Sequence, residues 1–275
     1  MSLIETAYAK INLALHVRSR REDGYHELET LFAFVDAGDI LSATRAEQDS
    51  LQIIGEFASV LASDANGDAF GNLVAKALSA LPRPQGLDIT LEKNLPVAAG
   101  LGGGSADAGA VFRLVEKLHG LPDDWQTRAA KLGADVPSCV RSEMAIGTGT
   151  GTELKPVEND LAGMPVMLVN PRVPLSTGAV FKAWDQTDHG PLPSGSAREI
   201  AQAGRNDLDT PAFDLCPVIP EVLSELDKDF PWLARMSGSG ATCFALYDTT
   251  DERDAAQNRL KDERPGWWTL AGKLR

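Results

Sequence analysis

A run of glycines that opens an amphipathic helix constrains this chain more than any other feature of its sequence. Four glycines occupy five consecutive positions, from Gly100 to Gly104, within residues 96–106. The apolar residues that follow recur at helical spacing until Gly120, namely Val111, Leu114, Val115 and Leu118. Glycines let a backbone approach a ligand closely, and the N–H groups at a helix start attract anions. The segment therefore predicts a phosphate-binding loop, with a tight turn that binds nothing as the alternative.

Two familiar nucleotide-binding patterns do not fit this loop. A P-loop requires Gly-x4-Gly-Lys-Ser/Thr, and no lysine follows these glycines. A dinucleotide fingerprint requires Gly-x-Gly-x-x-Gly, but counting from Gly100 the third glycine position holds Ser105. Ser105 can instead cap the helix or contact a phosphate oxygen. The loop is thus expected to hold phosphate groups without being a P-loop.

The charge balance argues against a nucleic-acid partner. The chain has 275 residues with 26 basic and 39 acidic side chains, whereas binding to a phosphate backbone requires clustered Lys and Arg. No apolar run approaches the ~18 residues of a membrane span, and the N-terminus lacks the pattern of a signal peptide. The three cysteines, Cys139, Cys216 and Cys243, form no Cys-x-x-Cys pair and are interpreted as reduced, packed thiols. We therefore expect a cytoplasmic protein that binds a small molecule, with no membrane partner.

Strands and helices alternate along the chain without a strict strand–helix–strand rhythm, which favours an α+β fold. Strands are expected at residues 3–17, 31–35, 39–56, 86–91 and 164–169 and on both sides of a turn within 236–246. Helices are expected at residues 72–81, after the glycine loop, and at 123–132, 217–226 and 251–263. Residues 145–153 are too glycine-rich for regular structure, and residues 185–199 are expected to form a mobile polar loop. A change of composition near 150–160 divides the chain into expected domains at 1–157 and 158–275.

Three segments together resemble the three motifs of the GHMP kinases, a family of small-molecule kinases. AKINLALHV (9–17) is similar to their first motif, PVAAGLGGGSADA (96–108) to their second and MSGSGATCFAL (236–246) to their third. The resemblance implies a two-domain fold: a ribosomal protein S5 domain 2-like N-terminal domain that binds ATP, and a ferredoxin-like C-terminal domain. It also implies Mg²⁺ as a cofactor. The segments DGYHELETLF and LGADVPSC narrow the match to the branch that phosphorylates a cytidine diphosphate-linked polyol for isoprenoid precursors.

The resemblance implies the roles of the residues that hold ATP and perform the transfer. Asp135 would act at the attacking hydroxyl with Lys10 as its partner; without the resemblance, Asp135 is equally well a helix cap and Lys10 a lysine whose stem reaches the surface. Lys93 faces the nucleotide or is simply solvated. We find no equivalent of a metal-binding glutamate, so the metal ligands stay unknown. The expected ATP-binding residues are Asn72, Leu73, Pro96, Val97, Ala98, Ala99, Gly100, Leu101, Gly102, Gly103, Gly104, Ser105 and Ala106.

The resemblance also implies a substrate site. Tyr25 and Phe181 would stack on the cytosine, and His26 would bind the edge of the base; the alternatives are an ordinary exposed pair and a core phenylalanine. Thr177 matches a substrate-binding position near Phe181. Asn12 lies on the same strand face as Lys10 and either binds substrate or makes a structural hydrogen bond. The turn at 237–240 either contacts the substrate phosphates or supports the glycine loop.

Two other functions are alternatives to a kinase that acts on a cytidine diphosphate-linked polyol. Another GHMP kinase, of the homoserine or mevalonate type, would have no use for a cytidine-binding DGYHELETLF segment. A nucleotide-binding protein without activity would not need both Lys10 and Asp135. The oligomeric state is expected to be a monomer or a weak homodimer.

Overall fold

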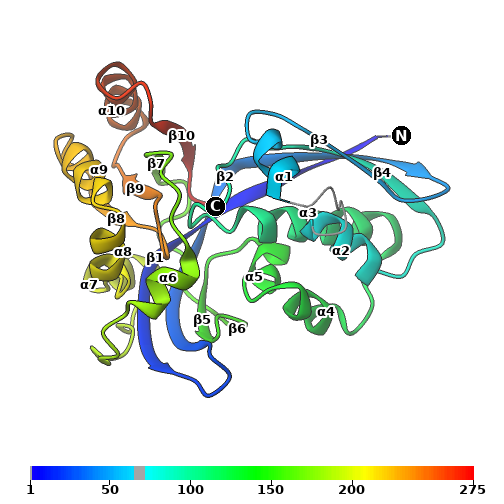
Figure 1. Ribbon diagram of the computed structural model, residues 1–275, viewed down its shortest axis with the longest axis horizontal. Coiled ribbons are helices and arrows are strands. Elements are labelled where there is room, and N and C mark those ends of the chain that lie inside the picture. Colours follow the sequence, from blue (N-terminus) through cyan, green and yellow to red (C-terminus); the bar gives the residue numbers. More distant parts are fainter. Residues whose placement is uncertain (1, 65–71) are drawn as a thin grey trace. The chain divides into compact units, whose positions relative to one another are not determined.

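The computed structural model describes residues 2–64 and 72–275, in which strands and helices are both abundant (Figure 1). The strands are β1 (Leu3–Arg20), β2 (His26–Ala46), β3 (Ser50–Ile54), β4 (Gly86–Glu92), β5 (Ala145–Gly149), β6 (Glu153–Pro156), β7 (Pro165–Asn170), β8 (Leu233–Met236), β9 (Cys243–Leu246) and β10 (Trp268–Lys273). The helices are α1 (Ala58–Asp64), α2 (Leu73–Ala80), α3 (Gly103–His119), α4 (Trp125–Leu132), α5 (Val136–Arg141), α6 (Thr177–Lys182), α7 (Ala197–Ala203), α8 (Asp209–Leu215), α9 (Val218–Asp227) and α10 (Thr250–Glu263). The expected α+β class is confirmed.

The chain forms two compact units, and each takes its residues from three stretches. The first unit contains Met1–Lys10, Gly38–Val97 and Gly102–Ser142. The second contains Ile11–Ala37, Ala98–Leu101 and Glu143–Arg275. The long strands β1 and β2 therefore contribute to both units. The expected boundary between residues 157 and 158 instead divides the chain into two continuous domains, and it stays a prediction.

The first unit combines a small sheet with a group of helices. Strand β4 pairs antiparallel with β2 over Ile40–Ala46 and parallel with β3. Its apolar residues alternate with exposed ones, and Leu87, Ile89 and Leu91 are fully buried, as their period of two predicts. Helices α2, α3, α4 and α5 pack against one another, and Figure 1 shows them gathered in one group.

Helix α3 connects the glycine loop to the core of the first unit. Its apolar residues Val111, Leu114 and Val115 are fully buried, and it ends at Gly120 as predicted. The Arg113 guanidinium fixes α3 against α5, because it donates hydrogen bonds to the carbonyl oxygens of Cys139 and Val140. Helix α5 begins directly after Asp135, so this packing holds the loop and Asp135 on neighbouring helices.

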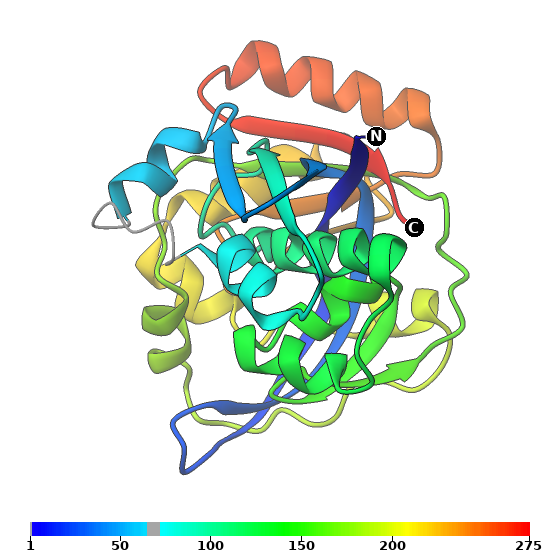
Figure 2. The ribbon, with the colours of Figure 1, turned by 90° about the vertical axis from the view of Figure 1, so that its right-hand side faces the viewer.

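The second unit contains a four-stranded antiparallel sheet in the order β10-β7-β9-β8. Helices α9 and α10 contact its strands, and α8 and α9 contact each other (Figure 1). In Figure 2, α10 and β10, coloured orange to red, run side by side. Side chains from β7, β9, α8, α9 and α10 form one hydrophobic cluster there. The first part of β2 pairs with β5, which in turn pairs with β6.

Two expectations about irregular segments were wrong, for steric reasons. Residues 145–153 form the hairpin of β5 and β6, because Gly147 makes room for Phe32 on β2: a Cβ at Gly147 would lie 2.5 Å from the ring. The break expected near residues 36–38 is absent, and β2 runs on to Ala46. A Cβ at Gly38 would meet the Ala7 oxygen at 1.9 Å, so this glycine allows close contact with β1.

The remaining expected elements are present with shifts of a few residues at their ends. The loop from residue 185 extends to Ser196, and α7 begins at Ala197, inside the segment expected to be irregular. Six further elements were not predicted from the sequence, namely α1, α5, α6, α7, α8 and β10. Five of these are helices of seven residues or fewer, which are too short to display a helical period.

Candidate active site

Lys10 and Asp135 form an ion pair in the first unit. Lys10 Nζ donates to Asp135 Oδ2 at 3.0 Å across 125 residues of sequence. The lysine side chain is 6% exposed and the carboxylate 34% exposed, so the anion keeps access to solvent while the cation is buried. Asp135 occupies the N-cap position of α5, yet its side chain makes no capping hydrogen bond. The geometry thus favours a paired carboxylate over the helix cap that the sequence left open.

The glycine loop lies against this ion pair. Gly102 is the N-cap of α3 in the left-handed conformation, with φ 59° and ψ 23°. A Cβ at Gly102 would lie 3.1 Å from Lys10 Cε and 3.7 Å from Asp135 Oδ2. The first turn of a helix also leaves backbone N–H groups that its own carbonyls do not accept. The helix start with its backbone N–H groups and the paired carboxylate therefore lie next to each other at Gly102, within one unit.

The 237–240 turn supports the loop from within the second unit. Ser237 Oγ donates to the Gly100 carbonyl at 2.9 Å, and the Thr242 N–H donates to the Ala99 carbonyl at 3.2 Å. A Cβ at Gly100 would lie 2.4 Å from the Ser237 oxygen, so the two backbones are in close contact. Asn206 holds the turn from the other side by donating to the carbonyls of Met236 and Gly238. The sequence left two roles open for this turn, contact with the substrate phosphates or support of the glycine loop. These hydrogen bonds are those of a turn that supports the loop.

Asn72 and Leu73 lie where α2 begins. The Asn72 side chain caps this helix by accepting from the Val74 N–H at 2.8 Å. A Cβ at Gly104 would lie 3.3 Å from Leu73 Cδ1, so Leu73 contacts the start of α3. A contact of either residue with a nucleotide stays a prediction.

The structure brings His26 and Phe181 together in the second unit. Their ring centroids are 4.9 Å apart with planes tilted by 35°. Trp184, which the sequence analysis did not single out, meets the His26 ring edge-on at 5.7 Å. Burial is the main reason why the pKa of His26 is lowered, and the nearby Arg20 adds to it. Tyr25 is 63% exposed on the preceding turn, and its contact with a base stays a prediction.

Asn12 and Thr177 each bond to a neighbouring hydroxyl group. Asn12 Nδ2 donates to Thr30 Oγ1 at 2.7 Å, and its backbone N–H donates to Ser237 Oγ at 3.2 Å. Ser239 Oγ donates to Thr177 Oγ1 at 2.9 Å. The structural hydrogen bond expected as an alternative for Asn12 is therefore present, and a role in binding stays a prediction. The pairing of Thr30 with Asn12 and of Ser239 with Thr177 carried no sequence signal, because the two members of each pair lie on separate elements.

Of the two alternatives for Lys93, the solvated one is wrong, and a position facing the nucleotide stays a prediction. The Lys93 ammonium group is buried between two carboxylates, from Asp39 and Asp107. The sequence offered no indication of this cluster, since the three residues belong to separate elements. Cys139, Cys216 and Cys243 are buried thiols, as expected. Burial, with the charge of Asp135 adding to it, raises the pKa of Cys139 to about 12, so this thiol stays protonated.

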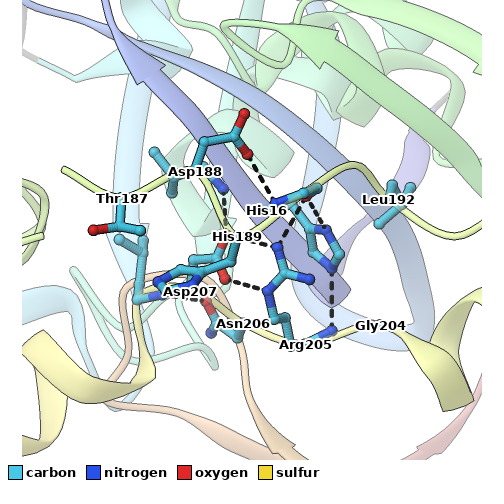
Figure 3. A network of polar contacts seen from close by, with 12 residues as sticks. His16, Thr187, Asp188, His189, Leu192, Gly204, Arg205, Asn206 and Asp207 are labelled. Carbon is cyan, nitrogen blue, oxygen red and sulfur yellow. Dashed lines mark hydrogen bonds and ion pairs between the residues drawn. The ribbon is translucent and has the colours of Figure 1, made fainter. Parts of the chain in front are cut away.

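A polar network fixes residues 188–192 to β1 and β2 in the second unit (Figure 3). Arg18 makes two hydrogen bonds to the Asp188 carboxylate, at 2.9 and 3.0 Å, and a third to Glu29. His16 is fully buried; its Nδ1 lies 3.1 Å from the Gly190 oxygen. Figure 3 shows His16 and Asp207 on either side of Arg205, which contacts both of them. The irregular segment is thus held by specific contacts that its polar sequence did not indicate.

Among residues 2–64 and 72–275, no group of three or more His, Cys, Asp or Glu side chains could hold a metal ion. None of the helices described for this chain is long and apolar enough to cross a membrane.

Comparison with known proteins gives two family matches. Residues 72–143 match the N-terminal domain of GHMP kinases, and residues 192–265 match the C-terminal domain. Together these matches cover more than half of the chain. The match to the N-terminal domain contains the glycine loop and Asp135.

Curated relatives resemble the chain over its whole length. The 4-diphosphocytidyl-2-C-methyl-D-erythritol kinase of Erythrobacter litoralis is 65% identical over 276 residues, covering 99% of each chain. The enzyme of the same name from Novosphingobium aromaticivorans is 66% identical over 275 residues, covering 100% of this chain and 94% of that protein.

Solved structures agree with these sequence matches. A crystal structure of 4-(cytidine 5'-diphospho)-2C-methyl-D-erythritol kinase has a TM-score of 0.82 at 33% identity, covering 99% of each chain. Homoserine kinase from Cytophaga hutchinsonii has a TM-score of 0.67 at 17% identity, which supports the fold alone. The two-domain fold expected from the motifs is confirmed. By motifs, domains and identity, the chain belongs to the GHMP kinases, in the family of the 4-diphosphocytidyl-2-C-methyl-D-erythritol kinases.

Proposed function

We infer that this chain transfers the γ-phosphoryl group of ATP to the 2-hydroxyl of 4-diphosphocytidyl-2-C-methyl-D-erythritol, in the non-mevalonate route to isoprenoid precursors. The products are ADP and the 2-phosphate of the acceptor. The observation that carries this function is the Lys10–Asp135 pair in contact with Gly102. Phosphoryl transfer needs hydrogen-bond donors for the phosphate oxygens and a group at the attacking hydroxyl. The backbone N–H groups of the loop and the Asp135 carboxylate lie next to each other at Gly102 and fit these two needs. The identity of the acceptor is supported by relatives that carry this name at 65–66% identity.

Asp135 accepts the proton of the acceptor hydroxyl as that oxygen attacks the γ-phosphorus. The carboxylate is one-third exposed, so a substrate can reach it. Lys10 holds this carboxylate in place through the hydrogen bond that its Nζ donates at 3.0 Å. The buried ammonium also offsets negative charge that develops on the transferring group. Backbone N–H groups of the loop and the start of α3 bind the triphosphate.

The nucleotide end of the acceptor binds in the second unit. Phe181 and Tyr25 stack on the cytosine, and His26, whose ring lies 4.9 Å from that of Phe181, donates to or accepts from the edge of the base. A neutral imidazole can do both, and the lowered pKa of His26 keeps it neutral near pH 7. The side chains of Asn12 and Thr177 bind polar groups of the acceptor. Hydrogen bonds to the hydroxyl groups of Thr30 and Ser239 orient these two side chains.

ATP is proposed to enter as its Mg²⁺ complex. Mg²⁺ keeps several waters and is bound by one or two carboxylates together with substrate phosphates, so it needs no cage of three side chains. The metal would neutralise phosphate charge.

We propose that the chain acts in the cytoplasm. Buried thiols at Cys139, Cys216 and Cys243 without a disulfide suit the reducing cytoplasm. The chain acts as a monomer or weak homodimer, without nucleic-acid or membrane partners. Its domains are 1–157, which contains the glycine loop, and 158–275.

Phosphorus NMR on one incubation tests the function. The protein, ATP, Mg²⁺ and the cytidylyl acceptor should yield ADP and a new phosphomonoester resonance, with the diphosphate resonances of the acceptor intact. Free methylerythritol and homoserine are the matched comparison acceptors, and both should react far more slowly. Equal rates on methylerythritol would reject the cytidine site. Consumption of homoserine alone would favour the homoserine kinase alternative, and no turnover of any acceptor would favour a binding protein.

A further inference from the structure

Three charged side chains form a buried cluster beneath the glycine loop. Lys93 follows β4, Asp39 lies on β2 and Asp107 lies in the first half of α3. All three side chains are at most 3% exposed. Lys93 Nζ donates to Asp39 Oδ2 and, at 2.8 Å, to Asp107 Oδ2. One cation and two carboxyl groups therefore share a site in the interior of the first unit.

The cluster reaches both ends of the loop. Asp39 Oδ1 accepts hydrogen bonds from the N–H groups of Asn94 at 2.6 Å and Leu95 at 2.8 Å, where the chain enters the loop. At the other end, a Cβ at Gly103 would lie 3.5 Å from Lys93 Nζ. The direction of that Cβ places the cluster under the start of α3. The same cluster of charged side chains therefore contacts the residues after β4, where the chain enters the loop, and the start of α3.

The charges of the cluster depend on one another. Burial raises the pKa of Asp107 to about 8 in spite of the attraction of Lys93, and Asp39 adds to the rise. Burial would lower the pKa of Lys93, but Asp107 and Asp39 outweigh it and the pKa is raised. Asp107 Oδ1 has no hydrogen-bond partner within the described residues, so a full charge there would be poorly stabilised. Near pH 7 the raised pKa of Asp107 therefore favours its protonated form, beside the ammonium group of Lys93.

Stability alone is a poor explanation for such a cluster. Replacing a buried ion pair by apolar side chains often leaves stability unchanged or raises it, because taking charges out of water is costly. What apolar side chains could not supply is the pair of hydrogen bonds from Asp39 to the loop entry. These bonds define where the backbone of Asn94 and Leu95 lies, and hence the path into Pro96.

We propose that Asp39, held by Lys93 and Asp107, is a positioning residue that keeps the glycine loop in the conformation that binds ATP. The proposal rests on the proposed function of the loop. Without the cluster, the loop would populate other conformations, and the apparent affinity for ATP would fall in proportion to the remaining competent fraction. Affinity for the cytidylyl acceptor would change little, because the residues proposed to bind its nucleotide end belong to the second unit.

Isosteric substitutions within the cluster test this proposal. Asp39→Asn removes the charge and turns an amide N–H₂ toward the Lys93 ammonium, or else toward the loop N–H groups. We expect the dissociation constant of an unreactive ATP analogue to rise about tenfold or more, as for a buried polar group that loses its partner. The dissociation constant of the cytidylyl acceptor should stay within about twofold. Asp107→Asn resembles the protonated form of Asp107 and should change both constants by less than about threefold.

Glu5→Gln is the control for a general loss of stability in the first unit. Glu5 is also buried and also pairs with two cations, Arg113 at 3.0 Å and Lys117, but it does not bond the loop. The variant should melt at a lower temperature with ATP-analogue affinity unchanged. Calorimetric titration of both ligands and thermal melting of each variant give all the required numbers.

Several results would overturn the positioning role. One is a folded Asp39→Asn variant that binds the ATP analogue as the wild type does. Others are equal losses for both ligands, or the same loss in Glu5→Gln. If Asp39→Asn does not fold, the wild type supplies the test: the Asn94 and Leu95 amides must be protected from hydrogen exchange without ligand, and rapid exchange would reject the proposal. A wild type that does not bind the analogue would reject the function of the loop instead.

Discussion

Gly102→Ala should separate the geometry of the reacting groups from the stability of the fold. An L-residue in the left-handed conformation, where Gly102 has φ 59° and ψ 23°, costs about 1–2 kcal/mol. The added methyl group would lie 3.1 Å from Lys10 Cε and 3.4 Å from Lys10 Cβ, so the lysine must move by a few tenths of an ångström. Lys10 is almost fully buried and cannot simply turn into solvent. Its Nζ should therefore shift relative to Asp135 Oδ2.

Two quantities follow from this geometry. The free energy of unfolding should fall by about 1–2 kcal/mol, which lowers the melting temperature by about 2–4 °C per kcal/mol in a chain of this size. The value of kcat should fall by about 10- to 100-fold, because small displacements of reacting groups are costly in phosphoryl transfer. A coupled assay of ADP release at saturating ATP and acceptor measures kcat, and calorimetry measures melting.

Gly120→Ala is the matched control at the other end of the same helix. Gly120 also has positive φ, 78° with ψ 167°, a region that costs other residues about 1–3 kcal/mol. A Cβ at Gly120 would have nothing within 4 Å, so this variant suffers the backbone strain without any crowding. It should be at least as destabilised as Gly102→Ala and keep full kcat. Equal kcat values for the two variants would refute the argument that Gly102 positions Lys10 and Asp135.

Three further predictions concern single side chains. Asp135→Asn should lower kcat by at least about 10²-fold, the low end for acid–base catalysis, with little change in binding of ATP or acceptor by titration; near-normal turnover would remove Asp135 from the mechanism. Tyr25→Ala should raise KM for the cytidylyl acceptor by about tenfold, the loss of one stacking contact, while KM for ATP stays constant in steady-state kinetics. His16→Gln should make stability less sensitive to acid below pH 6.5, as thermal melting at a series of pH values will reveal.

The pair of Lys10 and Asp135 illustrates what the sequence could provide. The two residues are 125 positions apart, and no spacing rule links them. Resemblance to a family supplied the pairing, whereas the residues alone favoured a helix cap for Asp135 at least as much, and favoured a surface lysine for Lys10. The glycine loop was different, because closely spaced glycines before an amphipathic helix are a local signal with a direct physical meaning.

Contacts between distant segments explain what the sequence could not provide. Gly38 and Gly147 resemble breaks in the local pattern, yet each lies in a strand because a neighbouring strand leaves no room for a Cβ. Asp39 follows Gly38 and resembles a turn residue. Its carboxylate nevertheless accepts hydrogen bonds from Lys93, Asn94 and Leu95, which lie 54 to 56 positions further along the chain. Local patterns describe one segment at a time, so the reason for such residues appears only when the partner segment is in place.

The pH dependence expected for His16 follows from its two hydrogen bonds in Figure 3. The Arg205 backbone N–H donates to Nε2 at 3.2 Å, so Nδ1 carries the hydrogen and donates to the Gly190 oxygen. A proton on Nε2 would abolish the first bond. Burial is the main cause of the lowered pKa of His16, with the Arg205 charge adding to it; Gly190, Asp207 and Pro191 act in the opposite direction.

A histidine whose pKa is lower in the folded protein than in the unfolded chain favours folding when it is neutral. Its contribution is therefore fully present above the unfolded pKa of about 6.5 and is lost as the pH falls below that value. In His16→Gln this loss is absent, so the melting temperatures of wild type and variant should run parallel above pH 7 and converge or cross on acidification. Curves that stay parallel down to pH 5 would mean that His16 titrates alike in both states, and that burial beside Arg205 leaves its proton affinity unchanged.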